Sequence, residues 1–270
     1  MNPNKALWEK GDFTRLAATM RESGAQVIND LGVGAGMDVL DLGCGDGTTA
    51  IPAAELGANV LGVDIAANLV AAGTARAAAA GLENIRFQEG DASDLQGIGD
   101  CSFDLVVSMF GAMFAPRPLD VARELVRVTR RGGRIVMGNW IAGNPTLVAQ
   151  ILKISAAYTP PPPEGFISPV TWGVEANVRE RFGAAGVKLE DISFERATYV
   201  FRSPRPTSDF LSVFRDYYGP TMNAFAAAAK DGRQGELEAE LAALFEAQNQ
   251  GGDERTEVPA VYLKVVVTKA

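Results

Sequence analysis

A glycine-rich segment, residues 41–47, carries the residue types and spacing best suited to binding a cofactor. It has the sequence Asp-Leu-Gly-Cys-Gly-Asp-Gly and lies between an apolar stretch, residues 39–42, and a stretch of helical character, residues 48–56. Glycine lets a backbone turn tightly and approach a ligand that a Cβ atom would block. The helix that follows offers free N–H groups and the positive end of its dipole. We therefore predict a ligand-binding loop between a strand and a helix.

Two kinds of cofactor suit such a loop. Dinucleotide enzymes favour Gly-x-Gly-x-x-Gly, whose third glycine lets the helix pack on the strand. Here Gly43 and Gly45 are followed by Thr48 at the place of that glycine. Asp41, just before the first glycines, would repel a pyrophosphate, whereas a sulfonium that also carries an ammonium group would tolerate this carboxylate or gain from it. The loop favours S-adenosylmethionine (SAM), and a nicotinamide-dependent oxidoreductase is the less favoured alternative.

Two more aspartates follow the next predicted strands. Asp64 ends a strand expected over residues 59–63, and Asp91 follows one expected over residues 85–88. A carboxylate at a strand end can accept two hydrogen bonds from a ribose diol, and we favour this role for Asp64 over that of a helix N-cap. Asp91 could accept from an adenine amino group while the backbone of Ala92 addresses the ring. Gly-Asp-Ala alone is a common turn, so this assignment depends on its place in the series.

The elements that position these residues alternate between strand and helix through residues 37–140. Strands are expected over residues 39–42, 59–63, 85–88, 103–108 and 134–138, and helices over residues 48–56, 67–80 and 118–129. Strands separated by helices indicate a parallel sheet covered on both faces. The carboxyl ends of its strands meet at one edge, which brings the loop and the aspartates together.

Composition excludes several kinds of chemistry. Histidine is absent and there are two cysteines, so a histidine base, a disulfide scaffold and a metal centre are all disfavoured. Lys and Arg number 25 and Asp and Glu 33, and the net charge of −8 argues against nucleic acid as a substrate. The densest basic patch, formed by Arg127, Arg130, Arg131 and Arg134, is interpreted as a solvated helix end.

The expected compartment follows from what the chain lacks. No apolar run approaches the roughly 18 residues of a membrane span. The first ten residues are polar and contain no apolar signal core. We therefore expect a cytoplasmic protein with no membrane partner.

The motifs, in this order, resemble those of class I SAM-dependent methyltransferases. They are most similar to the group around the ubiquinone and menaquinone biosynthesis methyltransferases (methyltransferase type 11-like). The resemblance covers residues 37–140, and its five motifs occupy residues 39–47, 62–65, 90–92, 103–108 and 124–134. It implies an α/β, Rossmann-like three-layer sandwich with helical cap insertions. Its seven-stranded, mostly parallel sheet would have the order 3-2-1-4-5-7-6. The antiparallel last strand, about residues 257–268, would lie between the fifth strand and one within residues 187–201.

The resemblance also implies cofactor-binding roles at the matching positions. The glycine loop would pass under the methionine part of SAM, and the residues after the fourth strand would line its reactive end. The implied cofactor-binding residues are Asp41, Gly43, Cys44, Gly45, Asp64, Ile65, Asp91, Ala92, Ser108, Met109 and Phe110. Near the N-terminus, residues 8–13 resemble a segment that lies over the cofactor in some relatives. The alternative is the start of an amphipathic helix with a core tryptophan.

The methyl acceptor is expected above the carboxyl ends of the strands, beneath cap segments at about residues 141–172 and 202–250. The Met- and Phe-rich segment 108–114 and the aromatic residues of the cap suggest an apolar or aromatic small molecule. Candidate pocket residues are Met113, Trp140, Tyr158 and Trp172. Phe210, Phe214, Tyr217 and Tyr218 form a helical stripe typical of core, although a hydroxyl of Tyr217 or Tyr218 could still reach a substrate.

The sequence therefore predicts one methyltransferase domain over residues 1–270, with an N-terminal helical lid over residues 1–34. Methyl transfer from a sulfonium is an in-line displacement, and positioning alone can contribute roughly 7–11 kcal/mol, so we assign no catalytic residue. The alternative is a SAM-binding partner or sensor without transferase activity. The acceptor atom (O, N, C or S) and the choice between monomer and homodimer stay open.

Overall fold

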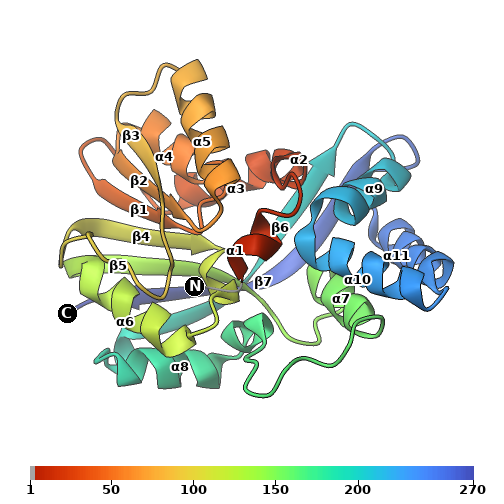
Figure 1. Cartoon of the computed structure of the whole chain (residues 1–270). Coiled ribbons are helices and arrows are strands. Elements are labelled where there is room, and N and C mark those ends of the chain that lie inside the picture. The colour runs from red at the N-terminus through yellow and green to blue at the C-terminus, as the bar shows by residue number, and fades with distance from the viewer. Residues whose placement is uncertain (1–3) are drawn as a thin grey trace.

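One seven-stranded sheet organises the part of the chain that the structure, a computed structural model, describes, residues 4–270 (Figure 1). Its order is β3-β2-β1-β4-β5-β7-β6. The strands are β1 (Asp38–Leu42), β2 (Asn59–Asp64), β3 (Ile85–Glu89), β4 (Phe103–Met109), β5 (Thr129–Trp140), β6 (Ile192–Ser203) and β7 (Thr256–Thr268). The first five are parallel, and β7 runs antiparallel between β5 and β6. The predicted fold class and strand order are confirmed.

Helices fill most of the connections between these strands. They are α1 (Asn4–Trp8), α2 (Thr14–Ala17), α3 (Arg21–Asp30), α4 (Ala50–Glu55), α5 (Ala67–Ala79), α6 (Pro118–Val128), α7 (Leu147–Ala156), α8 (Glu175–Ala184), α9 (Thr207–Tyr217), α10 (Gly219–Lys230) and α11 (Gln234–Gln248). The first three residues of the predicted lid lie outside the described residues. Across residues 4–270, no helix is both long enough and apolar enough to cross a bilayer.

Alternation along the central strands divides the core between the two faces of the sheet. Val39 of β1 and Val107 of β4 pack in a cluster with α3 and α4, whereas their neighbours Leu40 and Val106 pack in a cluster with α6 and α8. Successive side chains of a strand point to opposite faces, so apolar residues at consecutive positions require cover on both sides. This cover explains why the strands are nearly continuous apolar runs.

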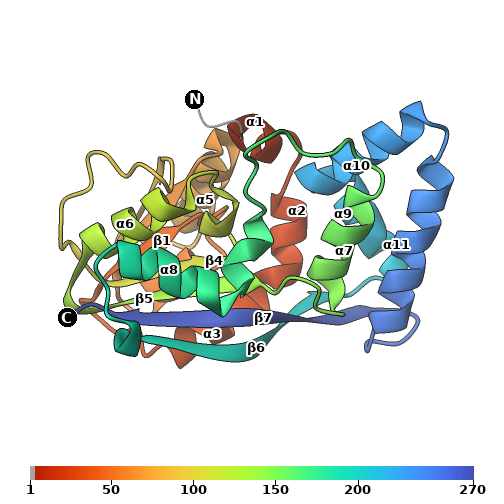
Figure 2. The same cartoon turned by 90° about the horizontal axis from the view of Figure 1, so that it is seen from below.

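Strands β6 and β7 continue past the end of β5 and carry the cap. Pairing of β5 with β7 ends at Trp140 opposite Tyr262, but β6 and β7 stay paired as far as Ser203 and Thr256. Helices α7, α9, α10 and α11 gather beside this extension, at the opposite end of the two long strands from α6 and α8 (Figure 2). The extension therefore gives the cap a rigid base.

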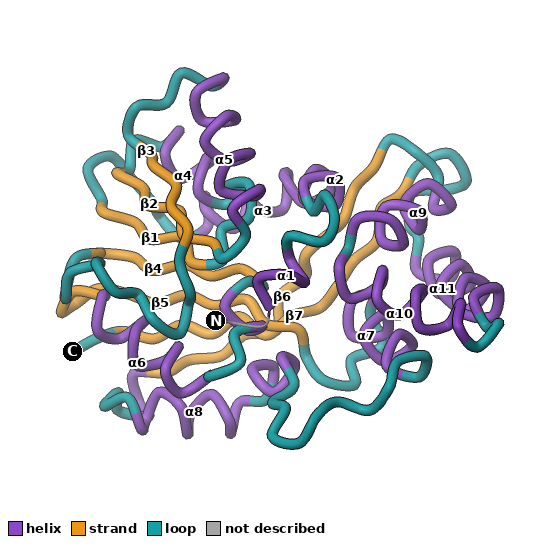
Figure 3. Tube along the Cα trace, in the orientation of Figure 1, coloured by secondary structure: helices purple, strands orange, loops and turns teal. Residues whose placement is uncertain are grey.

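A long loop, followed by the short helix η3 (Pro169–Gly173), connects α7 of the cap to α8 of the core (Figure 3). It contains the four prolines at residues 160–163, which lack a backbone donor and cannot continue a helix. Two predicted boundaries also shift. Strand β5 begins at Thr129 rather than residue 134, and α4 begins at Ala50 rather than residue 48 because residues 45–49 form turns.

Candidate cofactor and acceptor site

A cavity of about 1140 Å³, including its part open to solvent, lies at the carboxyl edge of the parallel strands. The segments that follow four neighbouring strands meet there, as the alternation of elements predicts. The predicted cofactor-binding residues that line the cavity are Gly43, Cys44, Gly45, Asp64, Ile65, Asp91, Ala92, Met109 and Phe110. Two others, Asp41 and Ser108, are buried but are not part of its lining.

The glycine loop after β1 packs directly against the segment after β4. Gly43 has a φ of +71°, and a Cβ atom there would lie 2.6 Å from the Cα atom of Gly111. In the other direction, a Cβ atom on Gly111 would lie 2.5 Å from the carbonyl oxygen of Gly43. Both residues must be glycine for the two backbones to approach this closely. The contact sets the floor of the cavity.

Asp64 ties the glycine loop to the segment that enters α5. Its Oδ2 atom accepts a hydrogen bond from the Gly45 N–H at 2.8 Å, and its Oδ1 atom accepts from the Ala66 N–H at 2.9 Å. Burial raises the pKa of this carboxyl group, and the backbone hydrogen bonds oppose the rise. Each carboxylate oxygen can accept a second hydrogen bond. Asp64 can thus hold the loop and a ligand diol together.

Asp41 lies beneath the loop instead of in the cavity. Its Oδ2 atom accepts a hydrogen bond from the Thr49 hydroxyl at 2.6 Å, and its Oδ1 atom has no hydrogen-bond partner. Burial, together with the nearby charge of Asp64, raises the pKa of Asp41 to about 7. Asp41 therefore does not line the cavity, and its predicted direct contact with a ligand is not supported by this lining.

Ser108 departs from its predicted place in the cavity wall. Its hydroxyl donates to the Leu42 carbonyl at 2.6 Å and accepts from the Ala112 N–H at 3.0 Å. These two bonds connect the end of β1 to the turn after β4. Because the side chain is turned into the backbone, it fixes the loops and leaves the lining to Met109 and Phe110.

Phe110 reaches the cavity through an unusual backbone conformation. Its φ is +65°, a region that bulky residues rarely adopt, at a cost of roughly 1–3 kcal/mol. Its ring stacks on Trp140 with centroids 3.7 Å apart and planes 7° apart. The edge-on rings of Tyr199 and Tyr262 lie 5.0 and 5.3 Å away. Strain held at a cavity wall is typical of a functional position.

The N-terminal segment covers the cavity. Trp8 and Phe13 both line it, with ring centroids 5.8 Å apart. Lys5 holds the segment in place, since its ammonium group donates to the Ile65 carbonyl at 3.0 Å and pairs with Glu9 at 2.7 Å. This arrangement favours the lid over the alternative of a simple amphipathic helix start.

Of the four candidate acceptor-pocket residues, Trp140 lines the cavity and the other three do not. Met113 packs in the core beneath it. The Tyr158 hydroxyl donates to Glu240 at 2.6 Å, which turns the ring toward α11. Trp172 packs against α8 and is 1% exposed. These three residues therefore do not form the wall of this cavity.

Four further aromatic residues line the cavity: two from β6 that the sequence did not indicate, and two from the predicted helical stripe. Tyr199 and Phe201 extend from β6, and Phe214 and Tyr218 from α9 and its C-terminal end. The alternation of aromatic residues at positions 199 and 201 was a signal of one buried strand face. It gave no indication of which cavity that face would meet.

The charged residues of the lining favour a cationic ligand. Its acidic side chains are Asp46, Asp64 and Asp91, and among residues 4–270 no lysine or arginine lines it. Asp46 is fully buried and accepts hydrogen bonds from the two terminal guanidinium nitrogens, Nη1 and Nη2, of Arg21. A pyrophosphate would meet carboxylates here, whereas a sulfonium with an ammonium group would be attracted. Within the same residues, no group of three or more potential ligands could hold a metal ion.

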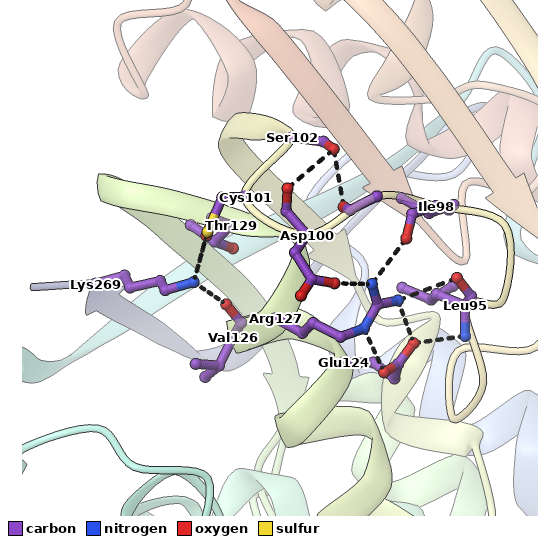
Figure 4. Close-up of polar contacts among 11 residues, drawn as sticks. Leu95, Ile98, Asp100, Cys101, Ser102, Glu124, Val126, Arg127, Thr129 and Lys269 are labelled. Atoms are coloured by element: carbon purple, nitrogen blue, oxygen red, sulfur yellow. Dashed lines mark hydrogen bonds and ion pairs between the residues drawn. The ribbon is translucent and has the colours of Figure 1, made fainter.

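Two of the four arginines of the basic patch, Arg127 and Arg130, are paired with carboxylates. Arg127 pairs with Asp100 at 2.7 Å and Glu124 at 2.8 Å, and donates to two carbonyl groups of the preceding loop (Figure 4). Arg130 pairs with Asp38 at 2.8 Å. These arginines connect a loop and strands, so they differ from the solvated helix end that was predicted.

Comparison with known proteins agrees with this geometry. The family model described as "Methyltransferase domain" matches residues 40–137. An uncharacterised protein of Mycobacterium tuberculosis is 34% identical over 230 residues, which are 84% of this chain and 80% of that protein. Nocamycin O-methyltransferase of Saccharothrix syringae is 40% identical over 103 residues, 37% of this chain and 36% of that enzyme.

A solved structure shows the same fold. Phosphoethanolamine N-methyltransferase 2 of Haemonchus contortus, in complex with phosphomonomethylethanolamine and S-adenosylhomocysteine (SAH), superposes with a TM-score of 0.58 at 17% identity. The match covers 92% of this chain and 53% of that one. Taken with the glycine loop and the cation-favouring cavity, these findings show that the chain belongs to the family of SAM-dependent methyltransferases. Its cofactor is SAM.

Proposed function

We propose that this protein transfers a methyl group from SAM to a small apolar or aromatic molecule. One observation carries the proposal. The cavity that is lined by the glycine loop and Asp64 is also lined by the aromatic residues Trp140, Tyr199 and Phe214. The predicted cofactor residues account for one part of the lining, and we assign the aromatic part to the acceptor.

The residues of the first part fit the cofactor. Asp64 would hold the ribose hydroxyls, Asp91 and Ala92 the adenine edge, and the loop from Gly43 to Gly45 the methionine part. When bound, SAM supplies a methyl group that its sulfonium charge has already activated. The chain contributes by aligning the two reactants and excluding water, which can account for roughly 7–11 kcal/mol of barrier reduction.

The lining also bears on how the acceptor loses its proton. In the described lining, the carboxylates Asp46, Asp64 and Asp91 belong to the loop and the cofactor end. The aromatic end contributes Tyr199 and Tyr218, and burial raises the pKa of both phenols. Neither phenol is a base near neutral pH. The proposal therefore favours an acceptor that is nucleophilic by itself, such as an acidic hydroxyl, a thiol or an amine.

We also propose that the protein acts in the cytoplasm, without nucleic-acid or membrane partners, as a monomer or homodimer. The net charge of −8 and the ion pairs of Arg127 and Arg130 support the absence of a nucleic-acid partner. Size-exclusion chromatography with light scattering distinguishes the two oligomeric states.

Transfer of labelled methyl groups tests the proposed function. Purified protein and SAM with a labelled methyl group are incubated with a cell lysate, and the small molecules are then separated from the protein and nucleic acid. Label should enter the small molecules that an apolar solvent extracts, and heat-inactivated protein gives the background. Label confined to macromolecules would contradict the proposal. Cofactor binding without turnover on any acceptor would instead favour a sensor or partner protein.

A further inference from the structure

Tyr218 occupies the junction between two cap helices at the aromatic end of the cavity. It follows α9 directly and precedes Gly219, the first residue of α10. The residue is 4% exposed and lines the cavity. Its ring lies 5.4 Å from that of Phe214 and 5.9 Å from that of Trp8. Rings from the cap and the lid thus fix its position.

The hydroxyl of Tyr218 makes no hydrogen bond within residues 4–270. Unlike the Thr221 hydroxyl, which is unpaired and completely buried, the Tyr218 hydroxyl is not completely buried. A buried phenol usually finds a partner for its O–H group. Because the side chain lines the cavity and its oxygen is not sealed, the hydroxyl opens into the cavity.

The neighbouring tyrosines differ in this respect. The Tyr199 hydroxyl, at the same end of the cavity, already donates to the Met20 carbonyl at 2.9 Å. Tyr217 precedes Tyr218 in the chain but does not line the cavity, and its ring lies 6.0 Å from the guanidinium group of Arg15. Of the two adjacent tyrosines, the structure therefore directs only Tyr218 to the acceptor end.

We propose that the Tyr218 hydroxyl donates a hydrogen bond to an oxygen atom of the methyl acceptor and so selects an oxygen-bearing planar aromatic molecule. The inference rests on the proposed function, because the molecule at this end is taken to be the acceptor. Burial raises the pKa of the phenol, so it stays protonated and acts as a donor. Tyr218 is a specificity residue here, since no proton has to leave it.

The surroundings narrow the class of molecule further. The walls beside Tyr218 are Trp8, Phe13 and Phe214, all aromatic. No lysine or arginine of the described residues lines the cavity, so a phosphorylated or carboxylated acceptor would leave a buried charge without a partner. A neutral aromatic with one oxygen substituent satisfies both the rings and the hydroxyl.

Paired probes test this role without requiring turnover. Binding of 2-naphthol and of naphthalene is measured by calorimetry on protein saturated with SAH, for the unmodified chain, Tyr218→Phe and Tyr217→Phe. The unmodified chain should bind 2-naphthol roughly three- to tenfold more tightly than naphthalene, the effect of one neutral hydrogen bond. Tyr218→Phe should lose this preference and keep its affinity for naphthalene. Tyr217→Phe, the matched control, should behave as the unmodified chain.

The results also separate this inference from the proposed function. Equal preference in the unmodified chain and in Tyr218→Phe would overturn the inference, as would failure of 2-naphthol to bind at all. Thermal unfolding of Tyr218→Phe shows whether the ring packing survives the change. Methyl transfer is read in the separate labelling assay, so a chain that prefers 2-naphthol but transfers no methyl group would contradict the proposed function alone.

Discussion

Asp41 of β1 and Asp64, the last residue of β2, both lie next to the glycine loop, yet they have different surroundings. Asp64 lines the cavity and accepts two backbone hydrogen bonds that shape the loop. Asp41 lies beneath the loop, with one carboxylate oxygen unpaired. An unpaired buried carboxylate costs folding energy, and a nearby cationic ligand would recover part of that cost. The buried carboxylate of Asp41 therefore lowers the stability of the cofactor-free protein and favours binding of a cationic cofactor.

Substitution of Asp41 tests this cost. The folded-state pKa of about 7 exceeds the value of about 3.9 in an unfolded chain, so the folded protein binds the proton more tightly. Its contribution to stability is complete below about pH 4 and is lost as the pH rises toward 7. Asp41→Asn cannot ionise, and its amide oxygen can still accept from the Thr49 hydroxyl.

Urea unfolding of the cofactor-free protein measures the effect. At pH 8, Asp41→Asn should be more stable than the unmodified chain by up to about 4 kcal/mol, and the difference should shrink to below about 2 kcal/mol at pH 5. The same variant should bind SAM more weakly, because it has lost the negative charge beneath the loop. A stability difference that did not change with pH would contradict this account of Asp41.

The sequence predicts which residues lie at the carboxyl ends of the strands. It does not predict which of their side chains point toward a ligand. Asp64 and Asp91 line the cavity because a carboxylate after a parallel strand is carried to the shared carboxyl edge. Ser108 comes from the same edge, but its short hydroxyl finds the Leu42 carbonyl and turns inward. The direction of the Ser108 hydroxyl depends on the distance between the segments after β1 and β4, which are far apart in the sequence.

At the scale of elements, the site depends on how closely the loops after β1 and β4 approach. The contact between Gly43 and Gly111 is backbone against backbone, so no side chain can yield to relieve a clash. The hydroxyl of Ser108 bridges the same two segments. The floor of the cavity therefore depends on the close approach of the loops that follow β1 and β4.

Gly111→Ala should separate these loops. Gly111 has a φ of −86°, so the backbone tolerates alanine and the clash with Gly43 is the sole obstacle. We expect a loss of roughly 1–3 kcal/mol in stability, as in overpacked cores, and at least a tenfold loss of SAH affinity measured by calorimetry. Gly34→Ala is the control, because nothing lies within 4 Å of its added Cβ atom. Undiminished SAH binding by Gly111→Ala would show that the contact is dispensable.

The cap segments could be predicted from the sequence, but the strands that support them could be predicted only in part. Its segments could be identified because they exceed the alternating core, and the order of the last strands followed from the family resemblance. The sequence did not show that β6 and β7 run on beyond Trp140 and bring Tyr199 and Phe201 to the cavity. How far β6 and β7 stay paired depends on both strands, and helices α9 to α11 separate them in the sequence.

For the molecule as a whole, the aromatic residues divide between binding and packing. Trp140 lines the cavity, whereas Trp172 belongs to η3 (Pro169–Gly173) and packs against α8, with its ring 6.0 Å from that of Phe182 and 4.5 Å from the Arg181 guanidinium group. The two tryptophans are indistinguishable by residue type. Only the fold assigns one to the site and the other to the core.

Trp172→Ala should therefore destabilise the protein without disabling the cofactor site. Removal of a buried tryptophan costs about 3–5 kcal/mol, which lowers the melting temperature by roughly 6–20 °C in a chain of this size. SAH affinity, measured well below the melting temperature, should stay within about twofold of the unmodified chain. A selective loss of SAH affinity with unchanged melting temperature would return Trp172 to the site.

We expect the cavity between the glycine loop and the cap to hold SAM. Calorimetric titration tests it most directly, with SAM and NAD on the unmodified chain, Asp64→Ala and the surface control Asp253→Asn. We predict that SAM binds at least a hundredfold more tightly than NAD and that Asp64→Ala loses roughly ten- to a hundredfold of this affinity, as expected for hydrogen bonds to a charged group. Asp253→Asn should bind as the unmodified chain does. Tighter binding of NAD than of SAM, or full SAM affinity in a folded Asp64→Ala, would contradict the claim.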